Sequence, residues 1–208
     1  MEGLILQGIG GFYTVRDEAG NRHTLRAQAK LRRQHMTPMV GDRVRFTPGR
    51  GEEEGWLEAI LPRENELMRP PVANIGMIAL VAAAASPEPD LLLIDRMLVC
   101  ARQRGIEAAV VINKCDLNPA GARDIARQYE RAARAALPVS ARSGEGIEAL
   151  RAALGGRVHA LGGQSGVGKS SLINALYGLD LQTGRVSDKI ERGRHTTRRC
   201  ELIEVPGG

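Results

Sequence analysis

The stretch VHALGGQSGVGKSSLINALY, residues 158–177, decides the fold of most of this chain. Its composition predicts a short apolar strand, a glycine-rich turn and a helix, in that order. The turn has the form Gly163-x4-Gly168-Lys169-Ser170, which is the spacing of a phosphate-binding P-loop. A glycine turn that merely contains a lysine is the alternative, and the complete spacing argues against it.

Each position of this turn has an expected role. The backbone N–H groups of residues 166–169 would surround a β-phosphate at the positive end of the helix. Lys169 would neutralise the β- and γ-phosphates and act in catalysis, and the Ser170 hydroxyl would ligate Mg²⁺. The predicted nucleotide-binding residues of this segment are Gly163, Gln164, Ser165, Gly166, Val167, Gly168, Lys169, Ser170 and Ser171.

A second motif, NKCD at residues 113–116, follows an apolar segment, residues 108–112, that predicts a buried strand. Ligands of open α/β sheets bind at the carboxyl ends of strands. Asp116 would accept hydrogen bonds from guanine N1–H and the 2-amino group, which adenine does not offer. Asn113 would brace the base and the neighbouring loops, and the stem of Lys114 would lie over the purine. Taken alone, four residues recur by chance, and a loop with a helix-capping Asp is the alternative.

The order of the two motifs is the most informative feature of the chain. In ordinary GTPases the phosphate loop precedes the base-reading loop, whereas here NKCD comes about fifty residues before the P-loop. The reversal predicts a circularly permuted GTP-binding domain. Between the motifs, Ser140 and Ala141 follow a short apolar segment, and the Ala141 N–H could reach guanine O6. This short sequence is common, so it only corroborates the assignment.

A polar stretch, GRHTTR at residues 193–198, lies downstream of the P-loop. Thr196 or Thr197 could close over Mg²⁺ and the γ-phosphate as a switch. An exposed basic loop is the alternative, and the sequence alone slightly favours it.

Residues 1 to about 65 have an all-β pattern, with short apolar runs separated by turn residues such as those of segment 17–21. In the run from Arg43 to Phe46 the side chains alternate, so both arginines should lie on one face. Several short strands in this length indicate an OB-fold barrel. Several basic residues lie nearby, and the sequence favours neither nucleic-acid contact nor a solvated basic face as their role. They are Arg22, Arg26, Lys30, Arg32 and Arg33.

Arg69-Pro70-Pro71 should break any regular element, and it marks a boundary between an OB domain, 1–67, and a GTPase domain, 68–208. Beyond it, strands are expected at 75–84, 108–112, 137–139 and 158–161. Helices are expected at 91–104, 120–136, 146–154 and 169–177. This alternation indicates a parallel α/β sheet.

Composition narrows the class of protein. The content of hydrophobic residues is 43% and the net charge is +5, which indicates a globular chain and is compatible with an RNA partner. The longest apolar run, residues 75–85, is too short to span a bilayer, and the N-terminus lacks the layout of a signal peptide. The three cysteines are scattered, so they are expected to be free thiols rather than zinc ligands.

Taken together, these residues resemble the ribosome small-subunit-dependent GTPase A family of bacterial ribosome-assembly factors over essentially the whole chain. The motifs that carry the resemblance are GGFYTV at 10–15, VGDRV at 40–44, LIDR at 93–96, NKCD at 113–116, the P-loop, and GRHTT at 193–197.

The resemblance implies a GTPase that works in late maturation of the 30S subunit and is stimulated by that subunit. It implies GTP or GDP with Mg²⁺ as ligands and contact of the OB domain with 16S ribosomal RNA. His195 matches a switch histidine proposed to position the attacking water, and its alternative is a surface histidine that contacts RNA. We expect a cytoplasmic monomer with neither DNA nor a membrane as partner.

One departure from the family is large. The family carries a D-x-P-G switch II motif and then a zinc-binding domain, and these 208 residues contain neither. Residues 200–205 with the following Pro206-Gly207-Gly208 match the strand and turn that precede switch II. The chain is therefore expected to be truncated there, impaired in hydrolysis, and without the zinc domain. A nucleotide- and RNA-binding module without significant turnover is the alternative, and NKCD argues against an ATPase or a small-molecule kinase.

Overall fold

The computed structural model describes residues 1–28, 30–31, 36–49, 53–181 and 200–205. The switch segment, with His195, Thr196 and Thr197, lies outside the described residues, as do Arg32 and Arg33. The described chain divides into two compact units. The first consists of residues 1–75 and 200–204, and the second of residues 76–181 and Val205. Within the described residues, no helix has the length and apolar character needed to cross a membrane.

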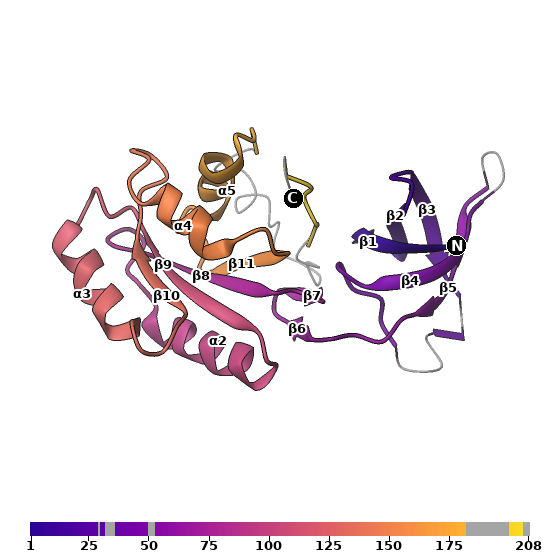
Figure 1. The fold of residues 1–208 in the computed structure, drawn as a ribbon, viewed down its shortest axis with the longest axis horizontal. Helices are drawn as coiled ribbons and strands as arrows, with labels where there is room; N and C mark the ends of the chain where they lie inside the picture. The colour runs from indigo at the N-terminus through magenta and orange to yellow at the C-terminus, as the bar shows by residue number, and fades with distance from the viewer. Residues whose placement is uncertain (29, 32–35, 50–52, 182–199, 206–208) are drawn as a thin grey trace, which may run out of the picture. The chain divides into compact units, whose positions relative to one another are not determined.

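The first unit is a closed five-stranded barrel (Figure 1), as the sequence predicts. Around the barrel the strands follow the order β1-β2-β3-β5-β4, in which β3 and β5 are parallel and the other neighbours antiparallel. This is the connectivity of an OB-fold. The strands are β1 Glu2–Ile9, β2 Phe12–Asp17, β3 Arg22–Ala27, β4 Arg43–Thr47 and β5 Gly55–Ile60.

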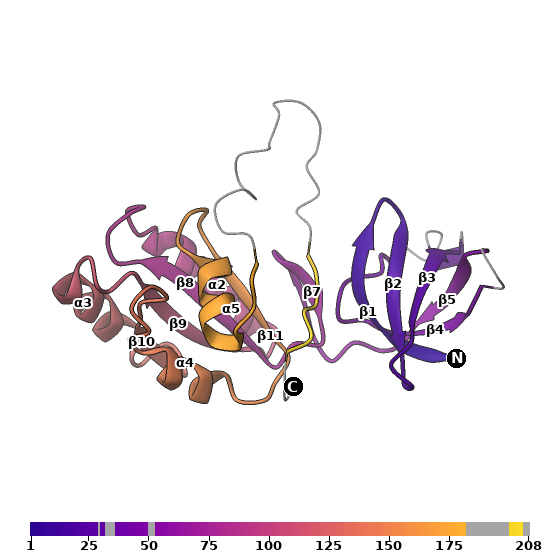
Figure 2. The same cartoon turned by 90° about the horizontal axis from the view of Figure 1, so that it is seen from above.

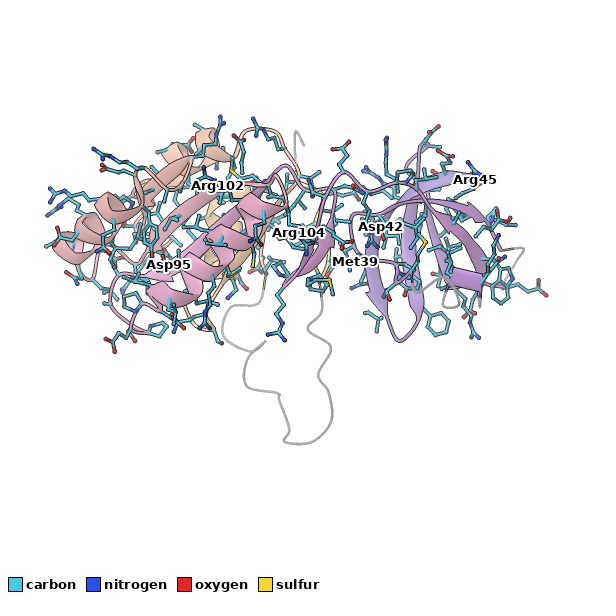
Figure 3. All side chains as sticks on the ribbon, turned by 90° about the horizontal axis from the view of Figure 1, so that it is seen from below. Met39, Asp42, Arg45, Asp95, Arg102 and Arg104 are labelled. Atoms are coloured by element: carbon cyan, nitrogen blue, oxygen red, sulfur yellow. The ribbon has the colours of Figure 1, made fainter. Side chains whose placement is uncertain are left out.

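Alternation along the strands fills the barrel. In β4 the side chains of Val44 and Phe46 are fully buried, whereas Arg43 and Arg45 are exposed on the outer face. Figure 3 labels Arg45. The inward side chains form one apolar core, which consists of Ile5, Val15, Leu25, Leu31, Val44, Phe46, Leu57 and Ile60. Each strand therefore offers only its outer side chains to solvent or to a partner.

A buried carboxylate connects the barrel to the segment that follows it. Asp42 is fully buried and accepts from the N–H of Met39, which lies beside it (Figure 3), at 2.7 Å. The guanidinium of Arg63 donates to both oxygens of Asp42, at 2.7 and 2.8 Å. Asp42 and Glu66 together raise the pKa of Arg63. The charge of Asp42 is therefore compensated inside the unit.

The segment Arg69-Pro70-Pro71 interrupts the strands and forms the turn of a short hairpin. Strand β6, Glu66–Met68, pairs antiparallel with β7, Pro71–Ala73, and Met68 faces Pro71 in the register. Proline is tolerated as the first residue of a strand. The expected domain boundary after residue 67 falls within this hairpin, whereas the first compact unit extends to Ile75.

The second unit is a parallel four-stranded sheet in the order β10-β9-β8-β11, with helices on both faces (Figures 1 and 2). Helices α4 and α5 pack on the face that carries the alternate β8 residues from Met77 to Ala83, while α2 and α3 cover the other face. The elements are β8 Met77–Ala83, α2 Leu91–Gln103, β9 Glu107–Asn113, α3 Pro119–Tyr129, β10 Ala135–Pro138, α4 Ile147–Leu154, β11 His159–Gly163 and α5 Lys169–Tyr177.

The sequence prediction of the helix after NKCD was too long. Asn118 caps α3 and Pro119 opens it, and the helix ends at Tyr129 rather than near residue 136. The Tyr129 hydroxyl donates to the carboxylate of Asp95 on α2 at 2.8 Å, which fixes the last turn of α3. The chain then turns, because residues 135–138 pair with β9 as β10. A helical pattern of arginine and alanine gave no sign of this sheet pairing.

Residues 200–205 do not form the expected strand in full. Glu201 makes a single antiparallel bridge with Gln7 of β1, and the Leu202 N–H donates to the Leu6 carbonyl at 2.8 Å. The carboxylate of Glu204 pairs with Arg16 and Arg22, which lower its pKa. Residues 200–204 therefore belong to the barrel unit.

Candidate nucleotide-binding site

The predicted motifs meet at one edge of the second unit. NKCD begins at the end of β9, Ser140 and Ala141 follow β10, and the P-loop begins at the end of β11. Because β8, β9, β10 and β11 are parallel, their carboxyl ends lie along the same edge of the sheet. The structure therefore brings these three segments together where α/β sheets bind ligands.

Three glycines allow the P-loop to pass close to its neighbours. Gly166 and Gly168 have φ values of +79° and +94°, a region that side chains rarely adopt. A Cβ atom on Gly168 would lie 2.4 Å from Asn113 Nδ2, and one on Gly163 would lie 2.1 Å from the Val81 carbonyl oxygen. Side chains at Gly163 and Gly168 would clash with these neighbours, so the glycines allow the close-packed, sharply turned backbone that a phosphate-binding loop needs.

Asn113 joins the base-reading loops to the phosphate loop. Its side chain is 2% exposed, and its Nδ2 donates to the Val167 carbonyl in the P-loop at 2.8 Å. Its Oδ1 accepts from the Ala141 N–H at 3.1 Å. Asn113 thus spans all three segments, as expected of a bracing residue. The Ala141 N–H is already bonded, so a guanine O6 at this position would have to share it or displace Asn113.

Both motif lysines contact P-loop carbonyl groups. Lys114 has φ +62°, and its Nζ donates to the Gly166 carbonyl at 2.9 Å and to the Ser86 carbonyl. Lys169 Nζ donates to the Gly163 carbonyl at 3.0 Å and to that of Gln164. The Lys114 stem therefore lies along the P-loop. The Lys169 side chain folds back over the P-loop and places its ammonium group next to the glycine turn.

Asp116 is exposed, whereas Cys115 beside it and Ser140 in the loop after β10 are held by hydrogen bonds. The Cys115 N–H donates to the Val139 carbonyl at 3.0 Å, and the buried Ser140 Oγ accepts from the Ser143 N–H at 3.1 Å. Burial, with Glu145 nearby, raises the pKa of the Cys115 thiol to about 11. Cys115 is therefore a neutral packing residue, and Asp116 is the exposed acidic side chain of the NKCD segment.

The segment after β8 also reaches the P-loop, which the sequence prediction missed. The Asp90 N–H donates to Gln164 Oε1 at 3.2 Å, while the Asp90 carboxylate caps α2 by accepting from the Leu93 N–H. Gln164 thus has a structural partner of its own. The signal was present, because a polar, proline-containing segment directly follows a buried strand of the same sheet.

The α5 hydroxyl groups suit a hard cation beside a phosphate. Ser170 is the second residue of α5, and both Ser170 and Ser171 are partly exposed next to the glycine turn. Mg²⁺ takes few protein ligands and completes its shell with phosphate oxygens and water. Across the described residues no three His, Cys, Asp or Glu side chains gather as a metal site of their own. The donors present therefore fit Mg²⁺ held jointly by Ser170 and a nucleotide.

Comparison with known proteins identifies the family. The family model described as RsgA GTPase matches residues 60–208, and that described as RsgA N-terminal domain matches residues 2–57. The chain belongs to the RsgA GTPase family. RsgA proteins of Geobacillus thermodenitrificans and Moorella thermoacetica are each 44% identical to it, over all of this chain and 72% or 71% of theirs.

Solved RsgA-type structures share the fold. YjeQ from Thermotoga maritima superposes with a TM-score of 0.71 at 36% identity, covering 88% of this chain and 67% of that one. YloQ, described as a circularly permuted GTPase, gives 0.63 at 31% identity, covering 83% and 63%. The prediction of an OB-like barrel followed by a GTPase domain with permuted motif order is confirmed.

Proposed function

We propose that this RsgA-family GTPase binds and hydrolyses GTP during biogenesis of the small ribosomal subunit. The relatives are described as small ribosomal subunit biogenesis GTPases, and GTP hydrolysis is the activity of the family. The observation that carries the proposal is the position of Asn113, because one buried side chain bonds both the phosphate loop and the loop after β10. Nucleotide contacts at either end would thus reinforce each other.

The residues would divide the nucleotide between them. Asp116 would accept from guanine N1–H and the 2-amino group, and the base would cover its now exposed carboxylate. The backbone of residues 166–169 would hold the β-phosphate, and Lys169 would exchange its carbonyl partners for phosphate oxygens. Ser170 would ligate Mg²⁺. We further propose that Thr196 or Thr197 completes the Mg²⁺ shell and that His195 positions the attacking water, on the strength of the GRHTT motif alone.

Binding to the 30S subunit would involve 16S ribosomal RNA through the barrel and would stimulate turnover. The protein would act as a monomer in the cytoplasm. These 208 residues contain no Asp-x-Pro-Gly motif, so we propose that this stretch alone hydrolyses GTP slowly. A nucleotide- and RNA-binding module remains the second candidate function.

The guanine assignment is tested with Asp116→Asn. The change should weaken GDP by roughly 5-fold to 150-fold, because Asn keeps one acceptor oxygen but turns an N–H donor toward the second guanine donor, which costs one hydrogen bond worth about 1–3 kcal/mol. Affinity for xanthosine diphosphate should rise, because xanthine presents a carbonyl where guanine has its amino group. Asp124→Asn, an exposed aspartate on α3, is the matched control. Unchanged GDP affinity in Asp116→Asn would show that another group reads the base.

Turnover is tested by measuring GTP hydrolysis with and without purified 30S subunits. We expect a slow basal rate, with nucleotide affinity intact. Hydrolysis by the 208 residues at the stimulated rate of a longer relative would contradict the requirement for an Asp-x-Pro-Gly motif. Tight nucleotide binding without any response to the subunit would favour the binding-module function.

A further inference from the structure

The outer face of the barrel carries a row of three side chains across three strands. In the register, Phe12 of β2 faces Arg26 of β3, and Arg26 faces Trp56 of β5. Phe12 and Trp56 are 36% and 49% exposed, and the Arg26 guanidinium lies 4.6 Å above the centre of the Phe12 ring. We call Phe12, Arg26 and Trp56 the aromatic row. Exposed apolar side chains that gather on one face are typical of a binding surface.

The aromatic row lies where an OB-fold presents its ligand surface. Phe12 begins β2 directly after the turn at Gly10 and Gly11, and Trp56 is the second residue of β5, directly after the β4–β5 loop. OB-folds bind single-stranded nucleic acid over strands 2 and 3 and these two loops. The row is therefore at the junction of both loops with the strand 2–3 face.

The charges of the row favour a base over a phosphate. Arg26 pairs with Glu54, so its positive charge is compensated locally. The two arginines on the same face, Arg16 and Arg22, lie opposite each other and about 13 Å along the strand from Phe12, four residues at 3.3–3.4 Å each. The two exposed rings, with the guanidinium of Arg26 on the strand between them, are suited to stack on the face of an unpaired base. Such stacking does not depend on which base it is.

We propose that the aromatic row is a stacking site for unpaired RNA bases. This inference rests on the proposed function, since it assigns the nucleic acid that the barrel would meet on the small ribosomal subunit. Trp56 and Phe12 supply the rings that stack on bases. Arg26 fixes the orientation of the Phe12 ring through its cation–π contact with one face of that ring. Duplex RNA would not fit, because its bases are already stacked on one another.

The test uses Trp56 as its own probe, since it is the only tryptophan in the 208 residues. Titration with an eight-nucleotide oligouridylate should quench its fluorescence, and a duplex of the same length should not. Trp56→Ala, measured by anisotropy of labelled RNA, should lose affinity by about 5-fold to 150-fold, the effect of one stacked base. Trp56→Phe should recover most of it. Met68→Ala, an exposed apolar residue of β6, is the control and should bind as the parent does.

Salt separates stacking from phosphate contact. The fold loss caused by Trp56→Ala should be the same at 50 and 200 mM salt, because no counterion is released by a base face. A loss that disappears at high salt would overturn the proposal, as would equal quenching by the duplex. A parent-like thermal unfolding transition of Trp56→Ala, followed by far-UV circular dichroism, shows that the barrel of the variant is folded.

Cosedimentation with 30S subunits distinguishes this inference from the proposed function. Oligouridylate binding without subunit binding would refute only the proposed function. Subunit binding that Trp56→Ala leaves intact, with oligouridylate affinity also unchanged, would refute only the aromatic row. Subunit binding that needs Trp56 while the parent ignores oligouridylate would indicate a protein partner, and would also overturn the proposal.

Discussion

Strands β4 and β8 show how differently the two units use a strand. β4 alternates, with Arg43 and Arg45 outside and Val44 and Phe46 inside, so half of its side chains remain available to solvent. Every residue of β8 from Met77 to Ala83 is buried, because helices cover both faces of the parallel sheet. The faces of the sheet are thus closed to ligands, while the outer face of the barrel is open.

The consequence is a different location for function in each unit. In the second unit the groups that can meet a ligand lie beyond the carboxyl ends of β9, β10 and β11 and are held there by Asn113. In the barrel the exposed aromatic row lies on the strands themselves. The effect of a substitution in the second unit should therefore depend on its position. Substitutions inside the strands of the sheet should lower the free energy of unfolding, and substitutions at the strand ends should weaken nucleotide binding.

The largest expected effect tests this division directly. Leu80 in the middle of β8 is fully buried, and Leu80→Ala should lower the free energy of unfolding by about 2–5 kcal/mol. Thr24→Ala on the outer face of β3 should cost less than about 1 kcal/mol, because only a cross-strand pair with Thr14 is weakened. Urea unfolding of both variants measures the difference. Equal costs would remove the contrast between the two kinds of strand.

The same contrast explains which parts of the fold the sequence predicts. The apolar run before NKCD and the alternation of β4 are local patterns that report burial on two faces or on one, and both predictions are confirmed. The P-loop helix begins at Lys169 because a complete local motif specifies it. Such features require no knowledge of the rest of the chain.

What the sequence did not predict depends on partners that are distant along the chain. α3 ends at Tyr129, whose hydroxyl group donates to Asp95, thirty-four residues earlier. The segment after β8 contacts the P-loop through Gln164, seventy-four residues from Asp90. The Ala141 N–H is bonded to Asn113 rather than left for a base. Each is a tertiary hydrogen bond, and no periodicity in the sequence encodes it.

An intermediate effect is expected at Asn113, where stability and binding meet. Asn113→Ala removes two hydrogen bonds of a buried amide. The Ala141 N–H and the Val167 carbonyl then lose their partner Asn113. The free energy of unfolding should fall by about 1–3 kcal/mol. GDP affinity should fall as well, because the two loops lose their common brace. Calorimetric titration of GDP with chemical unfolding measures both. Lost stability with unchanged GDP affinity would show that the brace serves the fold alone.

The smallest expected effect concerns acid stability of the barrel. Asp17 in the β2–β3 turn accepts from the Asn21 N–H at 2.8 Å and from the His23 ring at 2.9 Å. His23 first and Asn21 second lower the pKa of Asp17 from 3.8 to about 2. Because the folded-state pKa is the lower one, this stabilisation is present above pH 3.8 and is lost as the pH falls toward 2.

Asp17→Asn should therefore be less stable than the parent at pH 6, and the difference should shrink between pH 4 and pH 2. Thermal unfolding followed by Trp56 fluorescence reports the barrel itself, and Glu18→Gln, an exposed neighbour in the same turn, controls for the change of charge. Other carboxylates contribute equally to both proteins, so they cancel in the difference. A difference that stays constant from pH 6 to pH 2 would mean that the turn is held by its backbone hydrogen bonds and not by the ionised carboxylate.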